Sequence, residues 1–143
     1  MNSPKDVLGH NAYRVRLYPN EEQKQVLAKH FGCARFVYNK FLAAKIAYYK
    51  RTGKGVSFAT CCSKLTQLKK KLPWLAEVDS TCLQQALKNL DAAYQNFFRR
   101  CKQGGVPGFP KFKSKHDNHH SFRVVMGNAV EDNYLKIGKV GWI

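Results

Sequence analysis

Residues 79–103 read DSTCLQQALKNLDAAYQNFFRRCKQ, and the spacing of the apolar residues in this stretch predicts a long amphipathic helix. Asp79 and Ser80 can accept hydrogen bonds from the free amides of a first turn, so they can cap the start of the helix. The apolar residues then recur every three or four positions, at Leu83, Ala86, Leu87, Leu90, Tyr94 and Phe97. The Gly104-Gly105 pair ends the helix. A helix with one apolar face needs further elements to cover it.

Three more helices are predicted upstream. The first begins at the polar cap formed by residues 20–23 and is expected to end at Gly32. The second runs from about residue 33 to 50, and the third begins at Ser57 and ends before Pro73. Four amphipathic helices between residues 20 and 103 indicate a small bundle. The aromatic residues on their apolar faces are most simply its core.

Extended segments flank the predicted helices. Residues 12–18 alternate apolar side chains with arginines, which is typical of a half-buried strand with a basic outer face. Residues 121–126 and 134–137 are also predicted strands, and residues 140–143 begin another extended run. A strand ending on Trp142 and Ile143 would leave an unpaired edge, so either a partner segment is missing or this end lies against another part of the fold.

Because the first and last predicted strands flank the helices, we expect them to pair. The predicted fold class is α+β. A small β lobe, residues 12–18 and 107–143, is expected to be discontinuous and incomplete at its C-terminal edge. A helical lobe, residues 19–106, is inserted in it.

The charge of the chain is strongly unbalanced, with 25 Lys or Arg against 9 Asp or Glu and a formal net charge of +16. Residues 23–76 contain 12 Lys or Arg and no acid, and residues 92–116 contain six more and again no acid. A solvated helix normally mixes both signs, because pairs of opposite charge one turn apart stabilise it. The pattern therefore favours a surface that follows nucleic-acid phosphates. No segment approaches the ~20 apolar residues of a membrane span, so no membrane partner is expected.

The cysteines indicate a reducing compartment. Five is an odd number, two of the cysteines are adjacent, and no C-x-x-C occurs, which disfavours both disulfides and a zinc site. The three histidines of residues 116–120 more simply lie in a polar loop beside phosphates than ligate a metal. We therefore expect a cytoplasmic, nucleoid-associated protein with no cofactor in this chain.

Six short runs occur in a characteristic order. They are YRVRLYP (13–19), GCARFVYN (32–39), WLAEV (74–78), PGFPKFK (107–113), SFR (121–123) and KVGW (139–142). Together they resemble the N-terminal part of the TnpB (OrfB) proteins of insertion sequences, which are RNA-guided DNA endonucleases related to the type V CRISPR effectors. Any one run is a weak signal, but all six in order across residues 12–143 are specific. Gly138 departs from the family, which usually has proline there.

The resemblance implies a β-barrel-like wedge lobe with an inserted helical recognition lobe. It also implies two nucleic-acid partners: a guide RNA transcribed from the transposon end, and a target DNA with a short adjacent motif. In this family cleavage belongs to a later RuvC-like domain with a carboxylate triad, and a divalent metal is expected only there. Metal-assisted cleavage needs several converging carboxylates, so we expect this chain by itself not to be an enzyme.

The resemblance also assigns residues to reading the DNA motif. They are Phe58, Cys62, Ser80, Thr81, Gln84 and Asn128. Gln84 and Asn128 each offer a donor and an acceptor to a base edge, as adenine recognition requires. Phe58 and Thr81 can contact a thymine methyl group, although core packing is equally open for Phe58.

Ten basic residues are predicted to bind RNA or phosphate. They are Arg14, Arg16, Arg35, Arg99, Arg100, Lys102, Lys111, Lys113, Lys115 and Arg123. Arg35 is expected near a helix start, where it binds a phosphate or, alternatively, a helix carbonyl. The lysines of residues 111–115 alternate with Phe109 and Phe112, so we expect the lysines to face the RNA backbone and the rings to anchor the segment to the core.

Three functions remain open from the sequence. The first is a nuclease-deficient module that binds guide RNA and reads a target-adjacent DNA motif. The second is one half of a split RNA-guided endonuclease, completed by a separate RuvC-bearing chain. The third is a regulator that binds duplex DNA without RNA.

Overall fold

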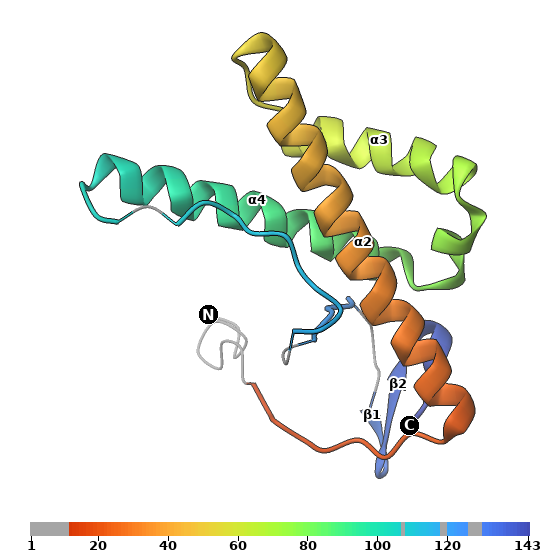
Figure 1. Ribbon diagram of the computed structural model, residues 1–143. Coiled ribbons are helices and arrows are strands. Elements are labelled where there is room, and N and C mark those ends of the chain that lie inside the picture. Colours follow the sequence, from red (N-terminus) through yellow and green to blue (C-terminus); the bar gives the residue numbers. More distant parts are fainter. Residues whose placement is uncertain (1–11, 107, 118–119, 126–129) are drawn as a thin grey trace, which may run out of the picture.

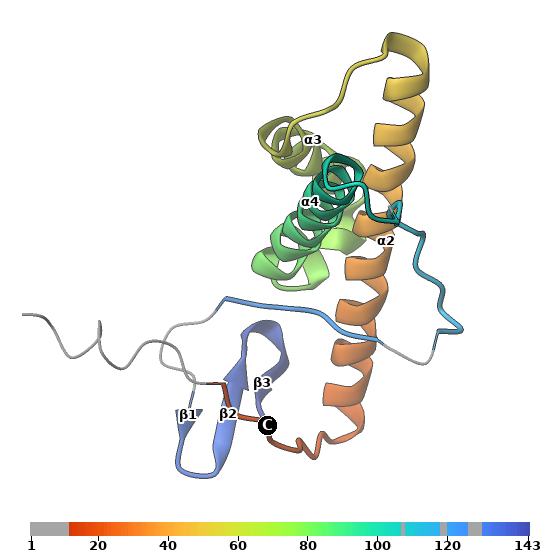
Figure 2. The ribbon, with the colours of Figure 1, turned by 90° about the vertical axis from the view of Figure 1, so that its left-hand side faces the viewer.

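The computed structural model describes residues 12–106, 108–117, 120–125 and 130–143. Its helices are α2 (Glu21–Thr52), α3 (Phe58–Lys71) and α4 (Ser80–Lys102), with the short 3₁₀ helix η1 (Pro73–Glu77) between α3 and α4. Figures 1 and 2 show α3 and α4 on one side of α2, both crossing it. A small sheet lies beside the N-terminal half of α2 (Figure 2).

Helix α2 is one continuous helix of 32 residues, so the predicted break at Gly32 is wrong. Its start follows the prediction: Asn20 Oδ1 accepts from the Gln23 amide at 2.8 Å, and Gln23 Oε1 accepts from the Asn20 amide at 2.9 Å. Gly53 ends the helix at a φ of 71°. A glycine inside a helix costs only about 0.5–1 kcal/mol. Burial of the residues that follow Gly32, such as Val37 and Leu42, outweighs this cost.

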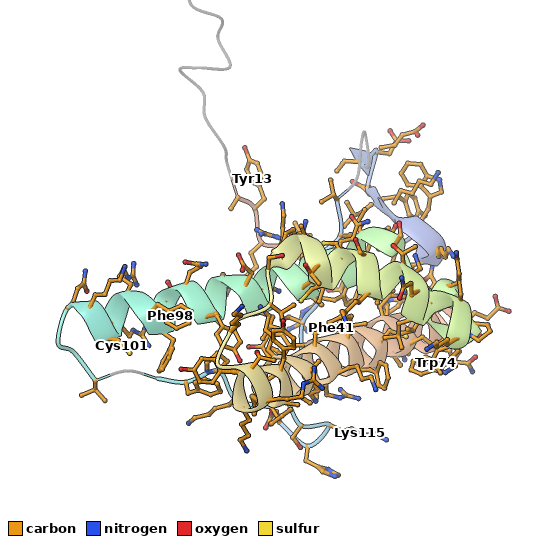
Figure 3. The ribbon with its side chains drawn as sticks, turned by 90° about the horizontal axis from the view of Figure 1, so that it is seen from above. Tyr13, Phe41, Trp74, Phe98, Cys101 and Lys115 are labelled. Atoms are coloured by element: carbon orange, nitrogen blue, oxygen red, sulfur yellow. The ribbon has the colours of Figure 1, made fainter. Side chains whose placement is uncertain are left out.

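The core lies where α2, α3 and α4 meet. The predicted apolar face of residues 79–103 is confirmed over its first half, because Leu83, Ala86, Leu87 and Leu90 are all buried. Phe41 of α2, labelled in Figure 3, is also buried. Tyr94 is only partly buried against this core, and the far end of α4 extends past α2 (Figure 1).

The start of each shorter helix is capped as the sequence predicts. The Ser57 hydroxyl accepts from the Thr60 amide at 3.2 Å, and Asp79 Oδ1 accepts from the Thr81 amide at 2.8 Å. Leu75 of η1 and the following Val78 are buried, so the turn between α3 and α4 is anchored in the core. The path between the two helices is therefore fixed by packing.

The sheet has the strands β1 (Val130–Glu131), β2 (Tyr134–Ile137) and β3 (Gly141–Trp142), antiparallel in the order β1-β2-β3. The short helix η2 (Gly138–Val140) joins β2 to β3. The predicted strand at residues 134–137 is confirmed. The end of the chain lies against β2, since Leu135 and Ile143 exchange backbone hydrogen bonds of 3.0 and 2.9 Å.

Two other predicted strands are not formed. Residues 12–20 adopt neither helix nor strand, and Tyr13 is 85% exposed. Residues 120–125 are also without a strand, and residue 126 lies outside the described part. Alternation alone does not make a strand, because a strand also needs a partner for its backbone hydrogen bonds. The expected pairing of residues 12–18 with the last strands is therefore wrong, and the barrel-like lobe and the two-lobe boundaries stay predictions.

The sheet is joined to the helices by polar contacts. The Gln23 side-chain amide donates to the Trp142 carbonyl at 2.6 Å, and the Lys139 ammonium donates to the Ala76 carbonyl. Gly138 lies against the Asp79 side chain that caps α4. These contacts place the sheet next to the starts of α2 and α4.

Candidate nucleic-acid interface

An extended segment crosses α2 after α4 and carries several of the predicted phosphate-binding residues. We call residues 108–117 and 120–125 the strap. The Asn39 side-chain amide holds it, accepting from the Lys113 backbone N–H and donating to the Lys113 carbonyl, both at 2.8 Å. The Asn39 side chain therefore pairs with both backbone groups of Lys113, although the two residues lie far apart in the sequence.

Aromatic rings fix the two ends of the strap. Phe109 packs edge-on against Tyr94 and Phe97 of α4, with ring centroids 5.5 and 5.2 Å away. Phe122 packs against His30 and Phe31 of α2, both at 5.0 Å. The rings thus anchor the strap as expected at Phe109. Phe112 is 54% exposed, so its ring is largely in solvent.

A cavity of about 50 Å³ opens where the strap crosses α2 and α4. Basic groups from two distant parts of the chain line it: Arg35 from α2, and Lys113 and Arg123 from the strap. Asn89 of α4 adds an amide, and Asp117 adds a carboxylate that accepts from the Ser114 backbone N–H at 3.0 Å. We call this the strap pocket. Its cations make it suited to an anionic group.

Arg35 lies inside α2 and not at its start, which corrects the expected position. A helix N-terminus offers free amides to a phosphate, but the backbone around Arg35 is already hydrogen-bonded within the helix. The Arg35 guanidinium lies over Gly32, one turn earlier, where a methyl group would make an ordinary contact of 3.8 Å with Nη2. Arg35 therefore offers its side chain alone.

The three strap lysines differ in their surroundings. The Lys113 ammonium lies over the Tyr38 ring, 4.7 Å from its centroid, so this cation is held at the pocket wall. Lys111 and Lys115 are exposed, and Figure 3 shows Lys115 projecting away from the helices. All three lysines are thus exposed, and Lys113 differs from the other two by its contact with the Tyr38 ring.

A hydrogen-bond network joins the start of α4 to α2 and the strap. His30 is fully buried; its Nδ1–H donates to the Val26 carbonyl at 2.8 Å, and its Nε2 accepts from the Asp79 backbone N–H at 3.1 Å. The Thr81 hydroxyl donates to Asp79 Oδ1 and accepts from the Val125 N–H at 3.0 Å. Both hydrogen-bonding capacities of this hydroxyl are therefore used inside the protein.

The predicted DNA-reading residues differ in their exposure to solvent. Ser80 and Gln84 are exposed, one turn apart on α4, whereas Phe58 and Cys62 of α3 pack against the core. Thr81 is half-buried and bonded as described above, and Asn128 lies outside the described residues. Gln84 is thus exposed on α4, whereas the Thr81 hydroxyl is engaged within the protein.

Lys88 is a residue that sequence reasoning missed. It is exposed one turn beyond Gln84. Burial raises the pKa of the Cys62 thiol, and the positive charge of Lys88 partly offsets that rise. Its position four residues after Gln84, and so on the same face of the predicted helix, could have pointed to it. Asn89 and Asn39 gave no signal of their own.

The other predicted cations lie at the edges of the molecule. Arg14 and Arg16 are exposed in the segment before α2, and Arg99, Arg100 and Lys102 are exposed in the last turn of α4. Between described residues only two ion pairs occur, Lys24 with Glu21 at 3.1 Å and Lys29 with Glu77 at 3.0 Å. Among the described residues, the other cations of both acid-free stretches therefore have no carboxylate within ion-pair distance.

The buried thiols are poor nucleophiles. All five cysteines are free thiols. Burial raises the pKa of Cys33 and Cys61, and it raises the pKa of Cys82 to about 12. In the described part of the chain, no three His, Cys, Asp or Glu side chains come together in a way that would hold a metal ion. Among the described helices, none combines the length and apolar character of a membrane crossing.

Comparison with known proteins gives one family match and several relatives. Residues 10–54 match a family described as a helix-turn-helix domain, from the OrfB proteins of IS605. A Streptomyces pristinaespiralis protein named as an RNA-guided DNA endonuclease is 38% identical over 106 residues, which cover 73% of this chain and 25% of the relative. InsQ of Escherichia coli K12, with the same description, is 31% identical over 136 residues, 92% of this chain and 32% of InsQ.

A third relative is much shorter. The virulence protein VsdF of Salmonella dublin is 38% identical over 114 residues, which cover 73% of this chain and 93% of VsdF. The chain thus spans a quarter to a third of the two endonuclease relatives and nearly the whole of VsdF.

The matched region does not have the geometry that its description suggests. A helix-turn-helix joins two helices at a steep angle through a short turn. Here residues 21–52 form the single helix α2, which is unbroken in Figures 1 and 2. The matched region is therefore an extended stretch, residues 12–20, followed by the side of one long helix.

Proposed function

The chain belongs to the TnpB/OrfB family of insertion-sequence proteins, and from this we propose that it is a nucleic-acid-binding module that holds a guide RNA and reads a DNA motif beside the target. The family match and the two endonuclease relatives support a DNA-binding part of an RNA-guided system. In this proposal the protein acts on the bacterial chromosome.

The observation that carries this proposal is the strap pocket. Arg35, Lys113 and Arg123 come from α2 and the strap and converge on one small cavity. Like charges around one cavity repel each other, although solvent screens the exposed ones, and an anion bound in the strap pocket would remove this repulsion. A chain of phosphates supplies that anion, with affinity that falls steeply as salt rises.

We propose that the two exposed residues at the start of α4 face the DNA. Ser80 and Gln84 lie one turn apart, and Lys88 follows after another turn. An amide and an ammonium on one helix face suit a base edge and the adjacent phosphate, respectively. In this proposal Phe58 and Cys62 of α3, which pack against the core, support this surface and do not themselves determine the DNA sequence that is read.

The first test is co-purification. The chain would be expressed together with the DNA that flanks its gene, and the bound nucleic acid would be sequenced. One RNA species with a defined 3′ boundary is expected. The double variant Arg35→Ala/Arg123→Ala should lose most of this RNA and flatten the salt dependence, by about 0.7–0.9 in slope per lost phosphate contact.

Lys24→Ala is the matched control, because Lys24 is an exposed lysine that pairs with Glu21 away from the strap pocket. It should retain the RNA. Random cellular RNA bound equally by all variants would overturn the guided-module proposal.

We further propose that this chain does not cleave nucleic acid by itself. Hydrolysis by metal ions needs carboxylates that converge on them, and the described carboxylates form no such group. Mg²⁺ or Mn²⁺ should therefore give no cleavage of the target by the purified chain with its RNA. Cleavage restored by a separate RuvC-bearing chain would favour the split-endonuclease form.

A second candidate is a stand-alone duplex-DNA-binding protein. VsdF favours it, since nearly the whole of that protein aligns with this chain. The continuous helix α2 opposes it, because the helix-turn-helix mode of entering the major groove needs a separate second helix. Co-purification of duplex DNA without any enriched RNA would select this candidate.

A further inference from the structure

Four aromatic rings form a cluster where α4 extends beyond the bundle. We call Tyr94, Phe97, Phe98 and Phe109 the ring cluster. Phe98 packs on Phe97 and Tyr94, with centroids 5.5 and 6.1 Å away, and Phe109 packs edge-on against the same two rings. Phe98 remains 50% exposed and Phe109 44% exposed. Phe98 and Phe109 are thus about half exposed to solvent, and both pack on Tyr94 and Phe97.

The sides of the ring cluster are cationic. The Lys45 ammonium lies 4.9 Å from the Tyr94 centroid. The Arg100 guanidinium lies against the strap backbone beside Phe109, since a methyl group on Gly108 would be 3.4 Å from Arg100 Nη1. Arg99, Lys102 and Lys111 are exposed on the same two segments, and residues 92–116 contain no acid.

We propose that the ring cluster is a stacking platform for unpaired RNA nucleotides, with the surrounding cations on the phosphates. Exposed aromatic rings among basic side chains are the arrangement that binds single strands, because any base can stack on a ring face while the backbone follows the charges. Bases in duplex RNA are already stacked, so they do not offer their faces to Phe98. This inference rests on the proposed function and specifies which part of the RNA the chain holds.

Charge decides between possible occupants of the cluster. A second copy of the chain would bring two sets of arginines together on a protein with a net charge of +16. Such repulsion opposes a symmetric contact. A polyanion that also presents flat apolar faces satisfies both the rings and the cations. Unpaired RNA has both properties.

The test compares the wild type with two variants at one exposed position, Phe98. Phe98→Leu keeps an apolar side chain on Tyr94 and Phe97 but removes the ring face, whereas Phe98→Tyr keeps the ring. The probe is a fluorescein-labelled uridine oligonucleotide of about a dozen residues, measured by anisotropy. Phe98→Leu should lower its affinity about five- to ten-fold, near the lower end of the range for one stacked base, and Phe98→Tyr should stay near the wild type.

Cys101 provides an independent reporter. It is exposed one turn beyond Phe98, and Figure 3 shows both on the side of α4 along which the chain returns. Bound oligonucleotide should slow alkylation of Cys101 by a neutral maleimide several-fold, whether or not any variant folds well. Unchanged alkylation at saturating oligonucleotide would overturn the proposal.

The remaining outcomes are also decisive. Equal affinities of Phe98→Leu and Phe98→Tyr, or an equal loss on duplex RNA, would exclude stacking on Phe98. A stronger ring-dependent effect with thymidine DNA than with uridine RNA would make displaced DNA the occupant and overturn the choice of RNA. If the Phe98→Leu loss is seen but no specific RNA co-purifies, the ring cluster stands and the guided-module function fails. If a specific RNA co-purifies but Phe98→Leu binds the oligonucleotide as well as the wild type does, the guided-module function stands and the ring-cluster proposal fails.

Discussion

Replacing His30 by leucine tests whether the buried network sets the geometry of the interface. His30 Nε2 accepts from the Asp79 N–H at 3.1 Å, and the imidazole is fully buried. Leucine fills a similar space but leaves that amide without an acceptor. Losing a neutral hydrogen bond costs about 0.5–1.5 kcal/mol, and an unsatisfied buried donor costs about 1–3 kcal/mol. We therefore expect His30→Leu to lower the free energy of unfolding by about 2–3 kcal/mol.

His30→Gln is the matched control, because a glutamine carbonyl can replace Nε2 as the acceptor for the Asp79 amide. It loses the bond to the Val26 carbonyl and the ring contact with Phe122, and should cost only about 1 kcal/mol. Urea unfolding followed by circular dichroism measures both. With a slope of about 1–3 kcal/mol per molar, the two midpoints should differ by roughly 1 M. Equal midpoints for the two variants would refute the proposed role of the Asp79–His30 bond.

Three further predictions follow from single contacts. Asn39→Ala should speed hydrogen exchange of the Lys113 amide by about 10–100-fold, since two bonds to the strap are lost, while Asn39→Asp, which keeps the acceptor, should speed it less. A slow Lys113 amide in both variants would contradict the clamp. Gly138→Ala places a methyl group 3.0 Å from the Asp79 carboxyl carbon and should cost about 0.5–2 kcal/mol through the helix cap, but little in an Asp79→Ala background. Additive losses in that double mutant would show that the cap is not involved. Because burial raises the pKa of Cys82 from 9.0 to about 12, only the unfolded thiol ionises above pH 9, and stability should fall by up to ~1.4 kcal/mol per pH unit there. The fall in urea midpoint between pH 8 and 10 should be smaller in Cys82→Ala, and an unchanged fall would assign it to other groups.

The helices were largely predictable because their signals are local. The caps at Asn20, Ser57 and Asp79 involve residues two or three positions apart, and the structure has all three. The prediction that the helix ends at Gly32 was wrong, because glycine adds only a small local free-energy cost to a helix. The burial of neighbouring residues of α2 outweighs that cost, so the helix continues.

The strand at residues 12–18 was read wrongly for the same reason. Its alternation is a local property, whereas a strand forms only with a partner. The strand at residues 134–137 was predicted, whereas its pairing with β3 was not and comes from the structure. The paired terminus at Ile143 needed the structure, since the sequence left both of its explanations open.

Of the candidate site, the sequence supplied the residue types and their signs. Arg35, Lys113 and Arg123 were each named from it, and so was Gln84. Their grouping was not available, because Arg35 is separated from the strap by some eighty residues of chain. Asn39 and His30, which hold the strap and the start of α4 in place, gave no separate signal.

The sequence alone therefore determined the family, the basic character, the helix starts and the apolar faces, because composition and short-range spacing encode them. The tertiary structure decided that α2 is unbroken, that the strap crosses it, and that three basic residues, Arg35, Lys113 and Arg123, line one pocket apart from the ring cluster. Those features depend on contacts between distant residues, whose energies are set by which surfaces meet and not by any local pattern.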